Sequence, residues 1–454
     1  MHFDLAIIGT GSGNSLVTPD FDGKHVAVIE KGLFGGTCLN VGCIPTKMFV
    51  YAAEVAESIR GASKYGIDAH LDRVRWRDIR DRVFGRIDPI EAGGRDYRVN
   101  GPGTTAYLGT ARFTGPRALV VDVDAREEEV TADQIVIATG STPVVPQAIR
   151  DSGVRFYTNE DVMRIDELPR RMTIVGGGYI AAEFAHVFGA LGVEITIVTR
   201  GPQMLRAQDE TVARAFSELA AQQWDVRFGT TVAGASQEGE VILLTLSDGV
   251  QLETDLLLVA AGREPLVPEG VSLASVELTQ DGRVEVDEFG RTTADGVWSL
   301  GDVSSAYQLK HVANHEARVV AHNLTHPEAL EEFDHRFVPA AVFTHPQVAS
   351  VGLTEQQARD VGHDLTVKVQ KYGDTAYGWA MEDTTSFVKL IADRRTGDLL
   401  GAHLMGPQAS SLIQPIVQAM SFGQSAVGLA RGQYWIHPAM AEVVENALLG
   451  LEFD

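Results

Sequence analysis

Cysteine is nearly absent from this chain, since its 454 residues include only two. Two cysteines cannot build a disulfide scaffold or a thiolate zinc site, so we predict no metal centre. No apolar run approaches the ~20 residues that cross a bilayer. A strand is expected from about Phe3, which leaves no room for a signal peptide. We therefore expect a cytoplasmic protein, where two close cysteines are more often catalytic than structural.

Positive charge is also scarce. Lysine and arginine total 38 against 61 acidic residues, for a net charge of −23. Binding to phosphate backbones or anionic membranes needs clustered cations, so nucleic acid and membrane partners are not expected. Hydrophobic residues make up 44% and charged residues 22%, which is typical of globular proteins. The length predicts two to four domains.

One pattern occurs twice along the chain. An apolar strand, a glycine-rich turn and a second strand open the sequence, and the same order returns after residue 170. A later strand is duplicated too, as IVIATG ending at Gly140 and LLLVAAG ending at Gly262. We interpret this as a duplicated dinucleotide-binding unit. The expected strands are 3–9, 25–30, 134–140, 171–176, 194–199 and 255–262, and the expected helices are 44–60 and 73–98. A linker is expected at 141–147. Short strands mixed with helices are expected after residue 335, which is typical of an α+β domain.

The first glycine turn suits a pyrophosphate. Gly9, Gly11 and Gly13 let the backbone approach closely, and the N-terminus of an expected following helix favours negative charge. Asn14 stands where the usual fingerprint has its third glycine, so the local packing should differ. Glu30 ends the next strand at a spacing suited to a ribose diol. A tight turn without a ligand is the alternative.

The second turn, Gly176-Gly177-Gly178, lacks the acidic residue at its strand end, where Thr199 stands instead. Arg200 follows directly and Arg206 is close. Arginines favour a ribose 2′-phosphate, which an acid would repel, so we expect NADPH rather than NADH. Two solvated surface arginines are the alternative.

The most specific signal is the segment GGTCLNVGCIPTK, from Gly35 to Lys47. Cys38 and Cys43 lie close enough to open and close as a disulfide, at the start of an expected helix whose N-terminus stabilises a thiolate. Pro45 suits the first position of that helix. Two ordinary buried thiols are the alternative.

A possible proton carrier lies near the C-terminus. Pro438 suits a first helical position, which would place His437 at the helix start and Glu442 one turn on. A carboxylate that bonds one imidazole nitrogen fixes the tautomer and raises basicity. A surface histidine at a helix cap is the alternative.

These motifs resemble the FAD-dependent pyridine nucleotide–disulfide oxidoreductases, such as glutathione reductase and lipoamide dehydrogenase. The resemblance spans nearly the whole chain and includes TADGVWSLGD (293–302) and FTHP (343–346). It implies an α/β fold with two Rossmann-like dinucleotide-binding domains, for FAD and NADPH, and a C-terminal α+β dimerisation domain. The expected divisions are 1–147 for FAD, 148–267 for NADPH, 268–334 completing the FAD domain, and 335–454 for the interface.

The resemblance also implies roles for single residues. Cys43 would face the flavin as the charge-transfer thiolate, and Cys38 would be the interchange thiol. Lys47 would pair with Glu183 beside the flavin. His437 and Glu442 would come from the partner subunit of a homodimer with a shared active site. The expected FAD-binding residues are Gly9, Gly11, Ser12, Gly13, Glu30, Gly36, Thr37, Cys38, Gly42, Cys43, Lys47, Ala111, Thr139, Gly140, Gly301, Asp302, Leu309, Lys310 and His311.

For NADPH, the resemblance implies that Tyr179 covers the nicotinamide pocket until the cofactor displaces it. The expected NADPH-binding residues are Gly176, Gly178, Tyr179, Ile180, Glu183, Arg200, Arg206, Gly262 and Arg263.

The substrate is expected to be a small disulfide. Glutathione reductases carry an arginine on the first helix, and an ungapped count places Pro19 there, which argues against an anionic peptide. The first glycine turn and the stretch 374–383 resemble the members that reduce mycothiol disulfide. Cys38 would attack the substrate, His437 would protonate the leaving thiol and Cys43 would resolve the mixed disulfide. A lipoamide dehydrogenase and a redox-sensing flavoprotein are the alternatives.

Overall fold

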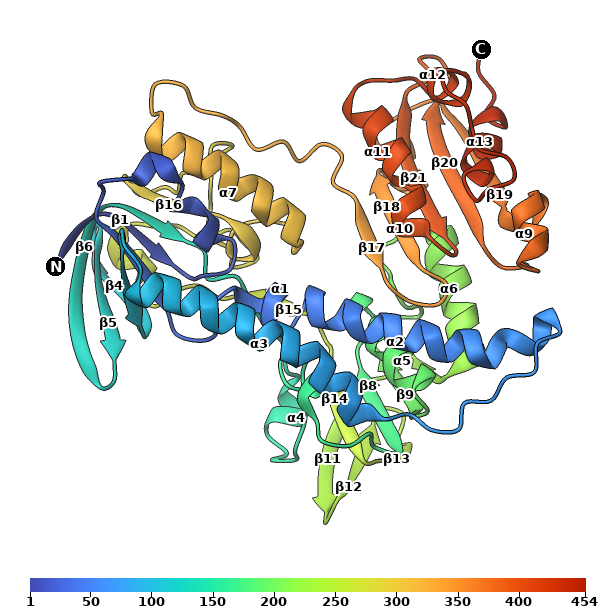
Figure 1. The fold of residues 1–454 in the computed structure, drawn as a ribbon, viewed down its shortest axis with the longest axis horizontal. Coiled ribbons are helices and arrows are strands. Elements are labelled where there is room, and N and C mark those ends of the chain that lie inside the picture. The colour runs from blue at the N-terminus through green and yellow to red at the C-terminus, as the bar shows by residue number, and fades with distance from the viewer.

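The computed structural model describes residues 1–454, and its first sheet is built around the N-terminal strand (Figure 1). The strand order is β3-β2-β1-β6-β5-β4, with β16 paired to β6. β1 runs parallel to β2 and β6, whereas β5 is antiparallel to β4 and β6. The strands are β1 His2–Ile8, β2 Val26–Glu30, β3 Thr104–Leu108, β4 Thr110–Gly115, β5 Ala118–Val123, β6 Arg126–Ile137 and β16 Val297–Ser299.

β1 is buried on both faces, which is why it reads as a continuous apolar run. Leu5 and Ile7 join a core cluster with helix α7 (Lys310–Thr325), whereas Ala6 and Ile8 join a second cluster on the other face. The side chains alternate with the two-residue period of a strand. α7 therefore lies against the same sheet as the first glycine turn, although about 300 residues separate them in the chain.

The second sheet repeats the parallel arrangement. Its order is β10-β9-β8-β14, with every pair parallel. A three-stranded antiparallel sheet extends from it, and β7 and β15 form a short ribbon. The elements are β7 Ser141–Pro143, α4 Gln147–Arg150, β8 Arg171–Val175, α5 Tyr179–Ala190, β9 Glu194–Thr199, α6 Glu210–Gln223, β10 Asp225–Phe228, β11 Val232–Glu238, β12 Val241–Leu246, β13 Gln251–Thr254, β14 Leu256–Val259 and β15 Arg263–Pro265.

Three helices connect the two glycine-turn units: α1 (Gly36–Asn40), α2 (Cys43–Gly61) and α3 (Trp76–Asn100). The largest core cluster contains Phe49 of α2 and Ile87 of α3 together with Phe184 and Phe188 of α5. These apolar faces hold α2, which begins at Cys43, against the second unit. Figure 1 shows α3 running from the first unit toward the second, and α2 lying along the second unit.

The C-terminal unit is an antiparallel sheet in the order β17-β18-β21-β20-β19, flanked by helices (Figure 1). A buried ion pair joins it to the second unit, because Lys389 Nζ lies 2.8 Å from Asp209 Oδ1 at the start of α6. The elements are β17 Ala340–Val342, β18 Val348–Gly352, α8 Glu355–Asp360, β19 Leu365–Lys371, α9 Ala376–Ala380, β20 Phe387–Asp393, β21 Leu399–Met405, α10 Ala409–Leu412, α11 Gln414–Ser421, α12 Ala426–Arg431 and α13 Glu442–Leu449.

The expected helix after the first glycine turn is absent. A 3-10 helix of four residues, Gly13–Leu16, takes its place, followed by a second 3-10 helix at Pro19–Phe21. Proline disfavours helical backbone in the residue before it, and Thr18 is extended. Pro19 therefore lies in a short 3-10 helix and not on a first α-helix, so the predicted match to the helix arginine of glutathione reductases was wrong.

The expected helix 44–60 corresponds to α2 within one residue at each end, but Pro45 is the third helical residue rather than the first. The other predicted helix start was wrong. α13 begins at Glu442 rather than at Pro438, because the chain from His437 to Ala441 forms turns. As to membranes, none of the helices combines the length and the apolar character that crossing a bilayer requires.

Candidate active site

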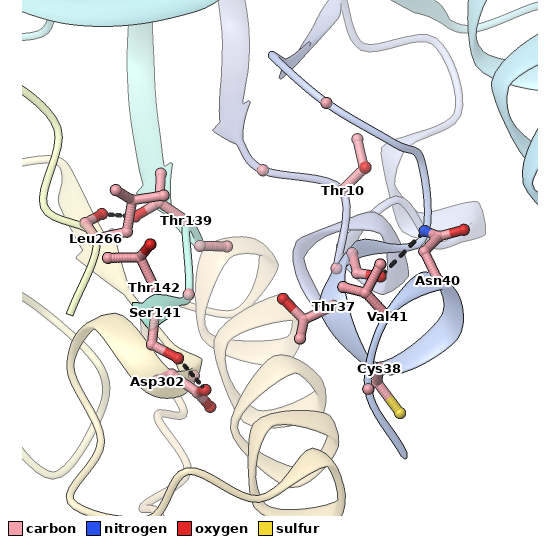
Figure 2. Close-up of a pocket in the computed structure, with 18 of the residues that line it drawn as sticks. Thr10, Thr37, Cys38, Asn40, Val41, Thr139, Ser141, Thr142, Leu266 and Asp302 are labelled. Atoms are coloured by element: carbon pink, nitrogen blue, oxygen red, sulfur yellow. Dashed lines mark hydrogen bonds between the residues drawn. The ribbon is translucent and has the colours of Figure 1, made fainter. Parts of the chain in front are cut away.

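A cavity of about 610 Å³ lies where the two glycine-turn units meet. It is lined by the first glycine turn, both cysteines, the start of α5 and the start of α7. Figure 2 shows Thr10, Thr37 and Cys38 on one side of the cavity and Ser141 and Asp302 on the other. The predicted residues that line it are Gly9, Gly11, Ser12, Glu30, Gly36, Thr37, Cys38, Gly42, Cys43, Lys47, Ala111, Thr139, Gly140, Tyr179, Ile180, Glu183, Arg263, Gly301, Asp302 and Lys310.

The glycine turn leaves no room for side chains. A Cβ on Gly9 would lie 2.3 Å from the Ala138 carbonyl oxygen, and one on Gly36 would lie 2.6 Å from Gly11 Cα. Both glycines also have positive φ, which other residues rarely adopt. The second glycine turn is packed in the same way, because a Cβ on Gly176 would meet the Ala260 carbonyl. The bare backbone and the elongated cavity fit a dinucleotide such as FAD.

Glu30 lies at the end of β2, where a ribose-binding acid is expected. Its Oε2 accepts hydrogen bonds from the backbone N–H (2.8 Å) and the hydroxyl (2.7 Å) of Thr10, and its Oε1 accepts one from Gly32 N–H (2.8 Å). An ionised carboxylate has about four acceptor sites. Glu30 therefore ties the turn to the strand end and can still accept a ribose hydroxyl.

The two cysteines lie on consecutive helices, Cys38 within α1 and Cys43 at the start of α2, and both are free thiols. Hydrogen bonding from Cys38, aided by the charge of Lys47, lowers the pKa of Cys43 to about 7, although partial burial opposes this shift. Hydrogen bonding to Cys43 and burial raise the pKa of Cys38. Cys43 is exposed and lines both the large cavity and a second pocket beside Ile44 and Met48. Of the two thiols, Cys43 is therefore the one that ionises more readily, and Cys38 stabilises its thiolate form.

Lys47 and Glu183 form the predicted ion pair. Lys47 Nζ lies 2.7 Å from both carboxylate oxygens of Glu183, which is buried. Glu183 Oε1 also accepts a hydrogen bond from Phe343 N–H at 3.0 Å, and Lys47 Nζ lies 4.8 Å from the centre of the Phe343 ring. The pair therefore connects α2, α5 and the C-terminal unit at the cavity wall.

Tyr179 opens α5 beside this pair and lines the cavity. Burial of its hydroxyl raises the pKa of Tyr179 to about 12, so the phenol stays neutral at physiological pH. The side chain is 42% exposed. An aromatic ring in this position can cover part of the cavity and still move.

Arg263, which is predicted to bind NADPH, forms hydrogen bonds within the protein. It is buried, and its guanidinium donates to Ser141 Oγ (2.8 Å), Ser141 O (2.7 Å) and Asn159 Oδ1 (3.0 Å). Ser141 Oγ donates to Asp302 Oδ2 at 2.7 Å, as Figure 2 shows. Asn159 Nδ2 donates to the carbonyl of Val41, between the two cysteines (3.1 Å). This network connects the second unit to the cysteine loop.

Ser141 and Asn159 were missed by the sequence prediction. Ser141 follows the ATG-like strand end, which is a usable signal, but nothing in the local sequence around Asn159 indicates its contact with Val41. Burial raises the pKa of Asp302, and the hydrogen bond from Ser141 opposes that shift.

The three residues expected at the start of α7 lie in different places. Lys310 lines the cavity, and its Nζ donates to Ser12 Oγ at 2.8 Å. Burial lowers the pKa of Lys310, whereas the nearby cysteines oppose this shift. Leu309 caps the helix, and the ring of His311 bonds the Pro339 carbonyl at 2.8 Å, so neither lines the cavity.

Arg200 and Arg206 lie outside the cavity and beside the second glycine turn. Leu205 N–H donates to the Gly177 carbonyl at 2.7 Å, which folds the loop after β9 back over that turn. Both arginines are exposed and make no ion pair. Two unpaired guanidinium groups beside a phosphate-binding turn are suited to a further phosphate.

His437 and Glu442 form a pair, although His437 precedes helix α13 and is not part of it. His437 Nδ1 lies 2.6 Å from Glu442 Oε1, while the histidine side chain is 70% exposed. The carboxylate orients the ring and leaves Nε2 open to solvent. No residue after Ala313 lines the cavity, so in one protomer this pair does not lie at the cysteines.

Two glycine-turn units that share a cavity with two cysteines define an enzyme that transfers electrons between a dinucleotide and a thiol pair. The chain belongs to the pyridine nucleotide-disulphide oxidoreductase family, whose model matches residues 3–317, and the model of that family's dimerisation domain matches residues 338–448. The expected family, fold class and enzyme class are thereby confirmed, and the cofactors are FAD and NADPH.

Relatives of known name match along the whole chain. A mycothione reductase of Mycobacterium tuberculosis is 58% identical, with 99% of each chain covered. A dihydrolipoyl dehydrogenase of Corynebacterium glutamicum is 34% identical over 99% of this chain and 98% of the relative. Among solved structures, the HOCl-induced flavoprotein disulfide reductase RclA from Escherichia coli has a TM-score of 0.86 at 29% identity, covering 98% of this chain and 99% of that one.

Proposed function

We propose that this enzyme reduces mycothiol disulfide at the expense of NADPH. The observation that carries the proposal is the 58% identity to a mycothione reductase over 99% of both chains. Identity to dihydrolipoyl dehydrogenases is much lower, at 33–34%. The two unpaired arginines, Arg200 and Arg206, support NADPH as the electron donor because they suit its 2′-phosphate.

In the bound state FAD would take electrons from NADPH and deliver them to the cysteine disulfide. The residues that would hold it are the first glycine turn, Glu30, the segment 301–302 and Lys310. Glu183 fixes Lys47 through two 2.7 Å contacts, so a positive charge stands beside Cys43 when the pair is reduced. The Lys47 charge favours the Cys43 thiolate, and the nearby Glu183 charge partly opposes this effect.

In the proposed reduction of the substrate, the two sulfurs act in turn. Cys38 loses its proton, and its sulfur attacks one substrate sulfur, which breaks the substrate S–S bond and releases one thiolate. A mixed disulfide between Cys38 and the other half remains. Cys43 attacks the Cys38 sulfur, re-forms the protein disulfide and releases the second thiolate. The two electrons of the dithiol have then passed to two product thiols.

His437 is proposed as the proton carrier of these steps, supplied by the partner subunit. Its Nε2 is open to solvent, its Nδ1 is held by Glu442, and no residue of the C-terminal unit lines the cavity of its own chain. A dimerisation domain in that region supports a homodimer with shared active sites. His437 would accept the proton of Cys38 and return it to the leaving thiol.

We also propose the division into 1–147, 148–267, 268–334 and 335–454. The pairing of β16 with β6 supports a central segment that returns to the first unit, and the separate sheet of β17–β21 supports the last boundary. Because the reaction consumes NADPH, we propose that the enzyme works in the cytoplasm.

Steady-state turnover tests the substrate. The purified enzyme with NADPH is given mycothiol disulfide, oxidised glutathione, lipoamide and trypanothione at equal concentrations. We expect kcat/KM to be highest for mycothiol disulfide. Equal or higher kcat/KM for lipoamide, together with a preference for NAD, would assign the enzyme to the dihydrolipoyl dehydrogenases instead.

A further inference from the structure

The first glycine turn is not followed by the long α-helix whose N-terminus usually neutralises a pyrophosphate. A long helix presents several free N–H groups and a partial positive charge at its N-terminus. Here the turn leads into a 3-10 helix of only four residues, which offers little of either. The same turn lines the cavity from Gly9 to Ser12, so a diphosphate bound against it would still need a positive charge nearby.

A buried arginine contacts this turn from another helix. Arg98 lies in the last turn of α3 and is only 7% exposed. Its Nε donates to Asn14 Oδ1 at 2.7 Å and its Nη2 donates to the Asn14 carbonyl at 2.9 Å. Asn14 is the residue at the third-glycine position, so its side chain has a specific partner.

Arg98 has no acidic partner. Both of its side-chain hydrogen bonds go to neutral oxygens of Asn14, and it takes part in no ion pair. Burial of the guanidinium lowers the pKa of Arg98. A buried charge without a counter-ion is strongly unfavourable. The C-terminus of α3 compensates part of it, since helix C-termini favour cations.

We propose that Arg98 acts as the counter-cation of the FAD diphosphate, and that it does so through Asn14. The arginine fixes the turn that the missing helix would otherwise fix and adds a full positive charge behind it. Lys310 reaches the same turn from the cavity side through Ser12. Arg98 is a positioning residue, because it lies behind the turn and does not line the cavity.

The test measures FAD release from the holoenzyme, as flavin fluorescence recovered after dilution, and thermal unfolding with and without added FAD. Arg98→Met should release FAD about ten- to a hundredfold faster, as expected for loss of charge-assisted interactions. Arg98→Lys keeps the charge and should stay within a few-fold of wild type. Arg95→Met, an exposed arginine one turn earlier on α3, is the matched control and should not change release.

Asn14→Asp separates charge from structure. An aspartate would form an ion pair with Arg98 and so strengthen the tie between α3 and the turn, while it removes the net positive charge. The proposal expects faster FAD release from this variant even where its unfolding temperature without free FAD is maintained. Because Asn14→Asp leaves Arg98 in place, this variant can also decide the question if Arg98→Met does not fold.

Two outcomes would overturn the proposal. Wild-type release from Arg98→Met would show that the cofactor does not sense the arginine, and slow release from Asn14→Asp would show that Arg98 only ties the helix in place. The inference depends on the family's flavin cofactor and not on the identity of the disulfide. FAD release therefore tests it separately from mycothiol disulfide turnover.

Discussion

The low pKa of Cys43 should depend on the other cysteine. Hydrogen bonding from Cys38 is the largest cause of the shift from 9.0 to about 7, ahead of the Lys47 charge. Cys38→Ala removes the donor, whereas Cys38→Ser replaces the thiol by a hydroxyl that can still donate. The two variants therefore differ in the hydrogen bond and in little else, and neither can form the protein disulfide.

The expected change in the pKa of Cys43 follows from the order of these causes. Loss of the largest one should raise the pKa of Cys43 from about 7 toward its ordinary value of 9.0, and solvent in the cavity limits what Lys47 alone can maintain. With the full two-unit shift, the thiolate fraction at pH 8 would fall from about nine tenths to about one tenth. Cys43 should therefore ionise at a higher pH in Cys38→Ala than in the wild-type enzyme.

Two measurements follow the same ionisation. One is the long-wavelength charge-transfer absorbance of the holoenzyme as a function of pH, and the other is the rate of Cys43 alkylation by iodoacetamide. Both should have their midpoint near pH 7 in Cys38→Ser and clearly higher in Cys38→Ala. Identical midpoints would refute the hydrogen-bond explanation. A band that survived Cys43→Ser would show that the roles of the two sulfurs are reversed.

Three further predictions concern other parts of the molecule. Arg200→Ala combined with Arg206→Ala should raise KM for NADPH far more than KM for NADH, because each lost phosphate contact is worth roughly 1.5–3 kcal/mol; equal changes for both cofactors would exclude a role in reading the 2′-phosphate. His437→Ala should slow the oxidative half-reaction by about 10²–10⁴-fold and leave flavin reduction nearly intact in stopped-flow traces. Mixing inactive His437→Ala and Cys38→Ser subunits should restore activity, and its absence after confirmed subunit exchange would contradict the shared site. Lys389→Met leaves a buried carboxylate unpaired and should lower the free energy of unfolding by roughly 3–5 kcal/mol in denaturant titrations; an unchanged value would mean that the pair contributes nothing net.

Much of the fold could be predicted from local patterns. The strand from Phe3, the paired ATG-like strands and the glycine turns are short-range signals, because the side-chain period and the glycine positions depend on neighbouring residues. The predicted strand Glu194–Thr199 matches β9 to the residue. The helix starts failed at Pro45 and Pro438, since proline tolerates a first turn without requiring one.

The sequence by itself determined the chemistry of this protein. Two cysteines five positions apart, two glycine turns and a histidine with an acid five residues later are covalent facts, and they restrict the reaction to electron transfer between a dinucleotide and a thiol pair.

The tertiary structure decided which groups meet. Arg98 reaches Asn14 over 84 residues, Asn159 reaches Val41 over 118, and Lys47 reaches Glu183 over 136. No local pattern encodes such contacts, because they depend on how α2, α3 and α5 pack between the two units. The absence of an α-helix after the first glycine turn was likewise not predictable from the local sequence, and in the fold Arg98 of α3 contacts Asn14 there.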